Sequence, residues 1–286
     1  MEFLEALTRF DFIRHALMAG VLAGVVCGVV GSYVVVRRIA SIAGAIAHCV
    51  LAGLGAARWL QVVHGQAWAS PMLGAVFAAL IAAGLIGLIS LHAREREDTL
   101  IGAVWAVGMA IGILFIARTP GYDQDLMSYL FGNILLVRGS DLWIMLVLDL
   151  VVVGVCAALF PQLQAVCFDE EFARLRGLNV ELYYLLLLIL TALTVVLLVT
   201  VVGIVLVIAL LTLPAAISGQ FTSSLRGMMI GAAALSIAFT VTGLAISYGP
   251  DLPAGATTIV VAGITYLLVL GGRRLLRGAI PQTRAR

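Results

Sequence analysis

The feature that most constrains this chain is a repeating pattern of long apolar runs separated by short polar breaks. Most runs are about 20 residues long, which is the length that an α-helix needs to cross the hydrocarbon core of a bilayer. Hydrophobic residues make up 63% of the chain and charged residues 11%, whereas an ordinary soluble domain has about 25% charged residues. The pattern predicts an all-α, polytopic membrane helix bundle that forms a single domain over residues 1–286.

Nine candidate spans can be drawn, and their bounds are 16–36, 39–60, 70–93, 99–118, 141–161, 180–202, 203–222, 227–248 and 255–272. The sixth and seventh spans are nearly continuous, and we expect the break between them near Gly203 or Pro214. Because one of these two could turn back within the membrane, the sequence predicts eight to nine transmembrane helices.

All 17 basic residues of the chain are arginines, and most lie in short clusters between the apolar runs. Such clusters are expected to face the cytoplasm. This rule places the N-terminal end outside the cell and the C-terminus inside, and it therefore requires an odd number of spans. Eight full spans would conflict with it. Residues 1–15 are amphipathic and lack the basic start of a signal peptide, so we expect an interfacial helix there.

One soluble-looking segment, "FDEEFARLRGLNVELYY", interrupts the second half at residues 168–184. Acidic side chains open it at Asp169 and Glu170, Arg174 follows, and Gly177 comes after the expected stop. Acid at the start, base near the end and a glycine after the last turn are typical of a short capped helix. It is either an ordinary loop helix or a helix that docks in a groove of a partner protein.

A single histidine, His48, stands inside the apolar stretch "SIAGAIAHCVLAG" of the second span. Ionisable residues in a membrane usually face the bundle interior or a water-filled cavity. His48 is either a structural residue that bonds to a neighbouring helix or a transient ligand for a metal ion, since imidazole is a ligand of zinc and of other transition metals.

Three aspartates are further candidates. Asp149 lies deep in the fifth span, where a carboxylate is costly unless it is paired, protonated or bound to a metal. Asp123 and Asp125, in the outer loop "GYDQDL", could attract cations or contact a protein that delivers them. We therefore take His48 and Asp149 as the candidate metal residues.

Sequence motifs for catalysis are absent. The chain has no lysine, so it cannot form the phosphate-binding loop G-x-x-x-x-G-K-[ST]. It also has no H-E-x-x-H and no G-x-S-x-G, which are motifs of metalloproteases and hydrolases. We expect no enzyme activity, and any ATP hydrolysis would belong to a separate subunit.

Taken together, several segments resemble the permease subunit of the bacterial ABC importers for zinc, manganese or iron ions. The resemblance is carried by "GSYVVVRRIASIAGAIAHCVLAG", "EDTLIGAVWAVGMAIGILF", "TPGYDQDLMSYLFGNIL", "FDEEFARLRGLNV" and "VVGIVLVIALLTLPAAISGQFT". It implies a multi-pass protein of the bacterial cytoplasmic (inner) membrane that imports a divalent metal ion by alternating access. The ion is cargo, and no permanently bound cofactor is expected.

The resemblance also implies partners: a cytoplasmic ATP-binding subunit, an extracytoplasmic metal-binding protein and a second permease, either a copy of this chain or a related one. Membrane lipid is expected around the bundle and nucleic acid is not a partner. Residues 168–179 would be the coupling helix, and the residues expected to act in coupling to the ATPase are Asp169, Glu170, Ala173, Leu175 and Gly177.

One position departs from the family pattern. Many relatives carry an aspartate four residues before the histidine, whereas this chain has Gly44. Only His48 can therefore be carried over as a metal residue of that pair, and which ion is moved stays open.

Two other classes of transporter are alternatives. An ABC permease for a metal chelate such as haem, cobalamin or a siderophore would share the partners but is generally longer. An ion-coupled secondary carrier would need a relay of intramembrane acids and bases, and it would leave the segment 168–179 without a purpose. Copurification with an ATPase would separate the carrier from the ABC permease.

Overall fold

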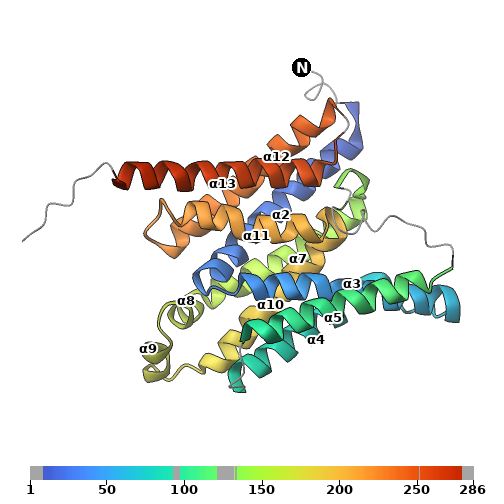
Figure 1. The fold of residues 1–286 in the computed structure, drawn as a ribbon, viewed down its shortest axis with the longest axis horizontal. Coiled ribbons are helices and arrows are strands. Elements are labelled where there is room, and N and C mark those ends of the chain that lie inside the picture. Colours follow the sequence, from blue (N-terminus) through green and yellow to red (C-terminus); the bar gives the residue numbers. More distant parts are fainter. Residues whose placement is uncertain (1–8, 93–96, 121–131, 133, 251, 279–286) are drawn as a thin grey trace, which may run out of the picture.

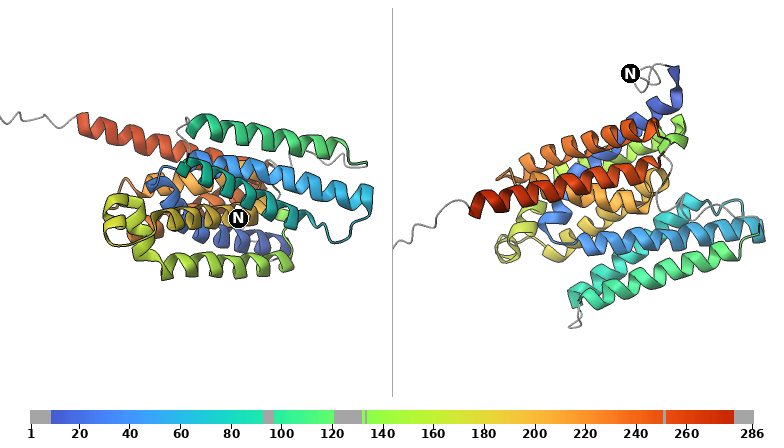
Figure 2. Two further views of the ribbon diagram at one scale, coloured as in Figure 1. Left: turned by 90° about the horizontal axis from the view of Figure 1, so that it is seen from below. Right: turned by 45° about the horizontal axis from the view of Figure 1, so that its top comes forward.

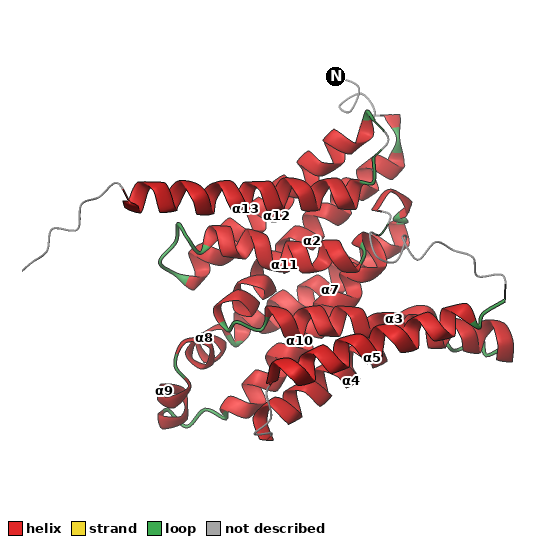
Figure 3. Cartoon of the chain, in the orientation of Figure 1, coloured by secondary structure: helices red, strands yellow, loops and turns green. Residues whose placement is uncertain are grey.

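The computed structural model describes residues 9–92, 97–120, 132, 134–250 and 252–278, and within these ranges it contains helices and no strand (Figures 1 and 3). Eight of the described helices are long and apolar enough to cross a membrane. They are α2 (Asp11–Val36), α3 (Ala40–His64), α4 (Pro71–His92), α5 (Glu97–Ala117), α7 (Gly139–Ala158), α10 (Val180–Val202), α12 (Leu225–Tyr248) and α13 (Ala254–Gly278). The prediction of an all-α polytopic bundle is confirmed, and the chain is a multi-pass membrane protein.

A further apolar helix, α11 (Ile204–Ser218), follows α10 directly. The two are separated at Gly203, whose φ of +83° is open to glycine and unfavourable for other residues. Of the two expected break points, Gly203 is therefore the one used, while Pro214 lies inside α11. At 1.5 Å per residue, α11 is about 22 Å long, which is shorter than the ~30 Å hydrocarbon core of a bilayer.

The ends of the helices show how the chain crosses the bundle. The short helices α8 (Phe160–Phe168) and α9 (Glu170–Leu175), the turn between α11 and α12, and the end of α13 all lie at the left of Figures 1 and 2. Helix α2 begins toward the opposite end (Figure 1). Helix α11 thus returns the chain to the end where α8 and α9 lie, which is the parity that the distribution of arginines requires.

The long helices form two groups that share α10. In one group, α3 packs against α4 and α5, and the right-hand view of Figure 2 shows these three helices side by side. In the other group, α2 packs against α7, α11 and α12, and α13 covers α11 and α12. Helix α10 contacts α4 and α3 on one side and α2 and α7 on the other, so it lies at the centre of the bundle.

Small residues let these helices approach closely. A Cβ atom added at Gly28 of α2 would lie 2.4 Å from the backbone nitrogen of Ala233 in α12. A Cβ atom at Gly108 of α5 would lie 2.4 Å from the Cys49 sulfur of α3. Both contacts have the form of the small-residue packing that is common between membrane helices, and the second one positions α5 at the candidate site described next.

Candidate functional site

Helix α3 holds His48 with one ring nitrogen engaged and the other available. Its Nδ1 atom lies 2.9 Å from the carbonyl oxygen of Gly44, one turn earlier on the same helix. Because a carbonyl oxygen can only accept, this hydrogen bond requires the proton on Nδ1 and leaves the lone pair on Nε2. The ring is buried in the single chain, and it presents Nε2 as its potential ligand atom.

The ring of His48 stacks on the indole of Trp105 from α5. The two ring centroids are 4.3 Å apart and the ring planes are inclined by 28°. The approach of Gly108 to Cys49 makes this stack possible, and the Cys49 thiol donates a hydrogen bond of 3.3 Å to the carbonyl oxygen of Val104. The neighbouring helix therefore fixes the plane of the imidazole from one side.

The indole of Trp105 also lies next to position 44, where this chain has a glycine in place of the expected aspartate. A Cβ atom added at Gly44 would lie 3.4 Å from Cζ3 of Trp105 and 3.9 Å from Cδ1 of Ile208 in α11. A methyl group would make ordinary van der Waals contact there. Trp105 and Ile208 thus bound the space beside Gly44 that a longer side chain would have to enter.

Within the described part of the chain, no ready-made metal centre surrounds His48. Among the residues that the structure describes, no three histidine, cysteine, aspartate or glutamate side chains are grouped so that they could hold an ion. Within the described residues, His48 therefore offers a single imidazole rather than part of a three-ligand group. A single imidazole would bind an ion more weakly than the closed ligand set of a structural zinc site.

Asp149 is the second predicted metal residue, and the structure does not place it with His48 in a three-ligand group. It lies on α7, which packs against α2, whereas α3 packs mainly against α4 and α5. Its side chain is 4% exposed, and neither carboxylate oxygen has a hydrogen-bond partner within the described part of the chain. A lone carboxylate is unstable in such surroundings, so we expect the neutral acid.

The charged segment after α8 forms the short capped helix that the sequence predicts. The Asp169 carboxylate accepts a hydrogen bond of 2.9 Å from the backbone N–H of Phe172 and caps α9 at its first turn. The chain leaves the helix through Gly177, whose φ is +77°, a value that favours glycine. Together with α8, this segment lies at the edge of the bundle (Figure 1).

Two of the α9 residues expected to act in coupling to the ATPase, Glu170 and Ala173, contact other parts of the same chain. Ala173 is fully buried against Val166 and Val180 of the same chain. Glu170 forms an ion pair with Arg37, at the end of α2. Leu175, by contrast, is 88% exposed. The docking role of this segment remains a prediction, and the exposed Leu175 is better placed for it than Ala173.

Two functional candidates were missing from the sequence interpretation. Trp105 is one apolar residue among many in its span, and only the contact between α3 and α5 reveals it. Phe172, which is 47% exposed on α9, could have been recognised as an aromatic residue within a charged segment.

Two of the predicted site residues, Asp123 and Asp125, lie outside the described residues. Residues 1–8 of the expected interfacial helix also lie outside them, whereas Asp11–His15 form the start of α2.

Comparison with known proteins decides the family. The family model of the ABC 3 transport family matches residues 9–272. The chain belongs to this family. The predicted relationship to metal-importing ABC permeases is therefore confirmed, and this ABC 3 chain is a membrane permease.

Named relatives are similar over nearly the whole ABC 3 chain. It is 41% identical to a probable metal transport system membrane protein of Chlamydia pneumoniae, over 92% of this chain and 91% of the relative. It is 35% identical to the manganese transport system membrane protein MntC of Listeria monocytogenes, over 94% of this chain and 93% of the relative.

A solved structure has the same fold. The structure described as PsaBC from Streptococcus pneumoniae in complex with Fab matches this ABC 3 chain with a TM-score of 0.83 and 30% identity. The match covers 94% of both chains, so the bundle described above has the fold of that structure.

Proposed function

We propose that this chain is the permease of an ATP-driven importer that moves a divalent transition-metal ion into the cytoplasm, with manganese as the first ion to test. The proposal is supported by the family and by relatives whose names state manganese transport. Zinc and iron are the other ions that an imidazole could bind.

The observation that carries the proposal is the hydrogen bonding of the His48 imidazole. The Nδ1 hydrogen bond to Gly44 aims a basic Nε2 away from its own backbone, in a buried part of a membrane helix. His48 lies eight residues after Ala40, the start of α3, or about 12 Å along the helix. One imidazole per chain gives a site that binds an ion transiently, and transport requires this because a tightly held ion would not be released.

Energy must reach this site through protein contacts. The chain carries no phosphate-binding loop, so a separate cytoplasmic ATPase would act on α9, and the paired permeases would alternate between outward-open and inward-open states. A metal-binding protein outside the membrane would deliver the ion. This arrangement gives α9 a purpose that an ion-coupled secondary carrier would not.

The experiment that tests the proposal compares cells with and without this chain. Accumulation of manganese, zinc and iron is measured in parallel, with haem and cobalamin as chelate controls. The proposal predicts that loss of the chain lowers the uptake of at least one free ion and leaves chelate uptake unchanged. A defect confined to a chelate would contradict the proposal and favour the chelate importer.

A further inference from the structure

Arg37 joins the capped helix α9 to the beginning of the helix that carries His48. It is the C-cap residue of α2, and its backbone N–H donates to the carbonyl oxygen of Tyr33. The next residue, Arg38, has a φ of +62°, which is uncommon outside glycine. The chain therefore turns sharply here, and α3 starts at Ala40. A force on Arg37 acts on this turn and on the first residues of α3.

The Arg37 side chain leaves the turn and meets α9. Its guanidinium forms an ion pair with the carboxylate of Glu170, the first residue of α9, although the two residues are 133 positions apart in the sequence. The Arg37 side chain is only 23% exposed and that of Glu170 is 41% exposed. Partial removal from water strengthens the attraction relative to a pair on an open surface.

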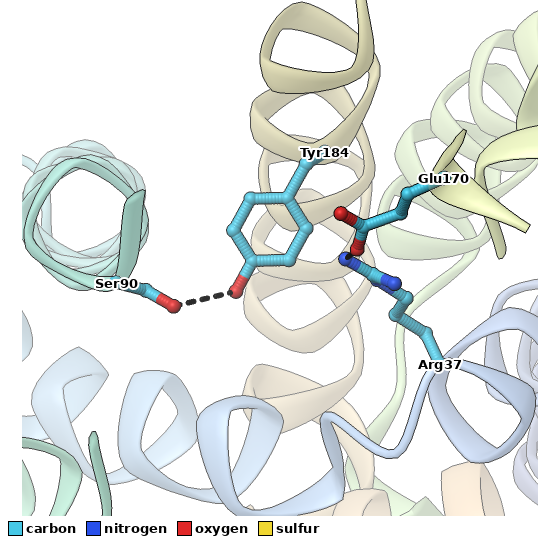
Figure 4. A network of polar contacts seen from close by, with 4 residues as sticks. All are labelled: Arg37, Ser90, Glu170 and Tyr184. Carbon is cyan, nitrogen blue, oxygen red and sulfur yellow. Dashed lines mark hydrogen bonds and ion pairs between the residues drawn. The ribbon is translucent and has the colours of Figure 1, made fainter. Parts of the chain in front are cut away.

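An aromatic platform holds the guanidinium in place. The centre of the guanidinium lies 5.4 Å from the ring centroid of Tyr184, which belongs to α10 and supports it by a cation–π contact. The Tyr184 hydroxyl donates to the Ser90 hydroxyl of α4 at 3.4 Å. Figure 4 shows these four side chains together, with the guanidinium beside both the Glu170 carboxylate and the Tyr184 ring.

Other contacts of α9 are made to neighbouring segments of the chain. Ala173 packs against Val166 of α8 and Val180 of α10. Arg174 approaches Glu181, at the start of α10, at 3.6 Å, and both of these side chains are more than half exposed. The Arg37–Glu170 pair differs from them because it connects α9 to the N-terminal half of the bundle.

We propose that Arg37 is a positioning residue that makes α9 and the start of α3 move together, and that its pair with Glu170 transmits ATPase movement to the helix of His48. This inference rests on the proposed function, since it assumes that α9 receives the ATPase. The pair itself does not touch the ion. Loss of the pair should leave ion binding intact but increase the ATP hydrolysed for each ion imported.

The test uses the whole complex: permease, ATPase and metal-binding protein in phospholipid vesicles supplied with manganese. Two quantities are measured, the ATP hydrolysed per manganese ion imported and the stimulation of ATP hydrolysis by the metal-binding protein. Glu170→Gln should raise the ATP consumed per ion by about five- to tenfold, the range of a modest coupling free energy. Glu171→Gln is the matched control on the same helix, because Glu171 is exposed, and it should change neither quantity.

A charge exchange tests the pair as a unit. The double variant Arg37→Glu with Glu170→Arg should recover part of the coupling that Glu170→Gln loses. Copurification of the ATPase verifies assembly of each complex. If the Arg37 variants fail to assemble, the ATP consumed per ion by the Glu170→Gln complex decides whether the pair acts in coupling.

Wild-type ATP consumption per ion in an assembled Glu170→Gln complex would overturn the inference, as would a double variant no better coupled than Glu170→Gln. Failure of the proposed function gives a different result, because wild-type vesicles would then import no manganese. If the imported ion is zinc or iron instead, stimulation of ATP hydrolysis by the metal-binding protein still reports on Arg37.

Discussion

His48 and the α9 segment are both identified from the sequence as candidate sites, yet they differ in what the sequence captures. At His48 the chemistry of one residue is evident, while its neighbours come from helices that are distant in the sequence. At α9 the local structure is evident, with the Asp169 cap and the Gly177 turn, while the directions of the side chains are set by the bundle. Chemistry and secondary structure are local properties, and packing partners are not.

The difference between the predictable helix α9 and its unpredicted packing is tested most strongly by a substitution at Ala173. Ala173→Glu would place a charge among Val166 and Val180, where Ala173 is fully buried. An unpaired buried charge costs about 3–5 kcal/mol, so we expect a large loss of permease stability together with loss of coupled transport. Thermal unfolding of the purified permease measures the first effect, and ATP-driven uptake measures the second.

The matched control is Leu175→Glu, since Leu175 is 88% exposed on the same helix. It should leave the unfolding temperature of the permease nearly unchanged while weakening ATPase copurification. If Ala173→Glu instead leaves the permease stable and removes only the ATPase, the burial of Ala173 against its own chain is not its main role.

The second prediction concerns the space beside His48. Gly44→Asp alone should bring the carboxylate against Trp105, since even a Cβ atom there lies 3.4 Å from the indole. Gly44→Asp combined with Trp105→Ala should accommodate the carboxylate and bind manganese about tenfold more tightly, as expected for an added ligand worth ~1.4 kcal/mol. Titration of vesicle uptake with manganese gives the apparent affinity of each variant. Equal affinity for the single and double variants would show that the indole does not obstruct this position.

Trp105 itself gives a smaller effect. Its stack on His48, with centroids 4.3 Å apart, should contribute ~0.5–1.5 kcal/mol. Trp105→Ala should therefore weaken the apparent affinity for manganese by about two- to tenfold, because the imidazole is less firmly positioned. Trp105→Phe keeps an aromatic face and should retain most of the wild-type affinity. Equal affinities for the two variants would contradict the role given to the stack.

The smallest effect is expected at Asp149. If its buried carboxyl is neutral, Asp149→Asn replaces it with a group of nearly the same shape and should change uptake by no more than about twofold, or ~0.5 kcal/mol. Uptake of manganese and zinc is measured in the same vesicles. A fall of tenfold or more in a well-assembled variant would show that Asp149 acts as a carboxylate on the ion route.

How much of the structure could be predicted from the sequence follows the same division between local properties and packing partners. The apolar runs predict the spans, because bilayer thickness fixes helix length, and the glycine at position 203 makes the break between α10 and α11. The Arg37–Glu170 pair was not predicted, because its residues are 133 positions apart and each has charged neighbours that are equally plausible partners. Nor was the stack on Trp105, because periodicity does not reveal which helix lies against α3.

The central claim, that the ion passes through contact with His48, is tested most directly by manganese uptake into vesicles that contain the His48→Ala complex. The account predicts a fall of about tenfold or more, corresponding to a ligand worth at least ~1.4 kcal/mol, with ATPase copurification and permease stability unchanged. His64→Ala, at the exposed end of the same helix, should transport at the wild-type rate. Wild-type uptake of manganese, zinc and iron by an assembled His48→Ala complex would contradict the claim and make His48 a structural residue.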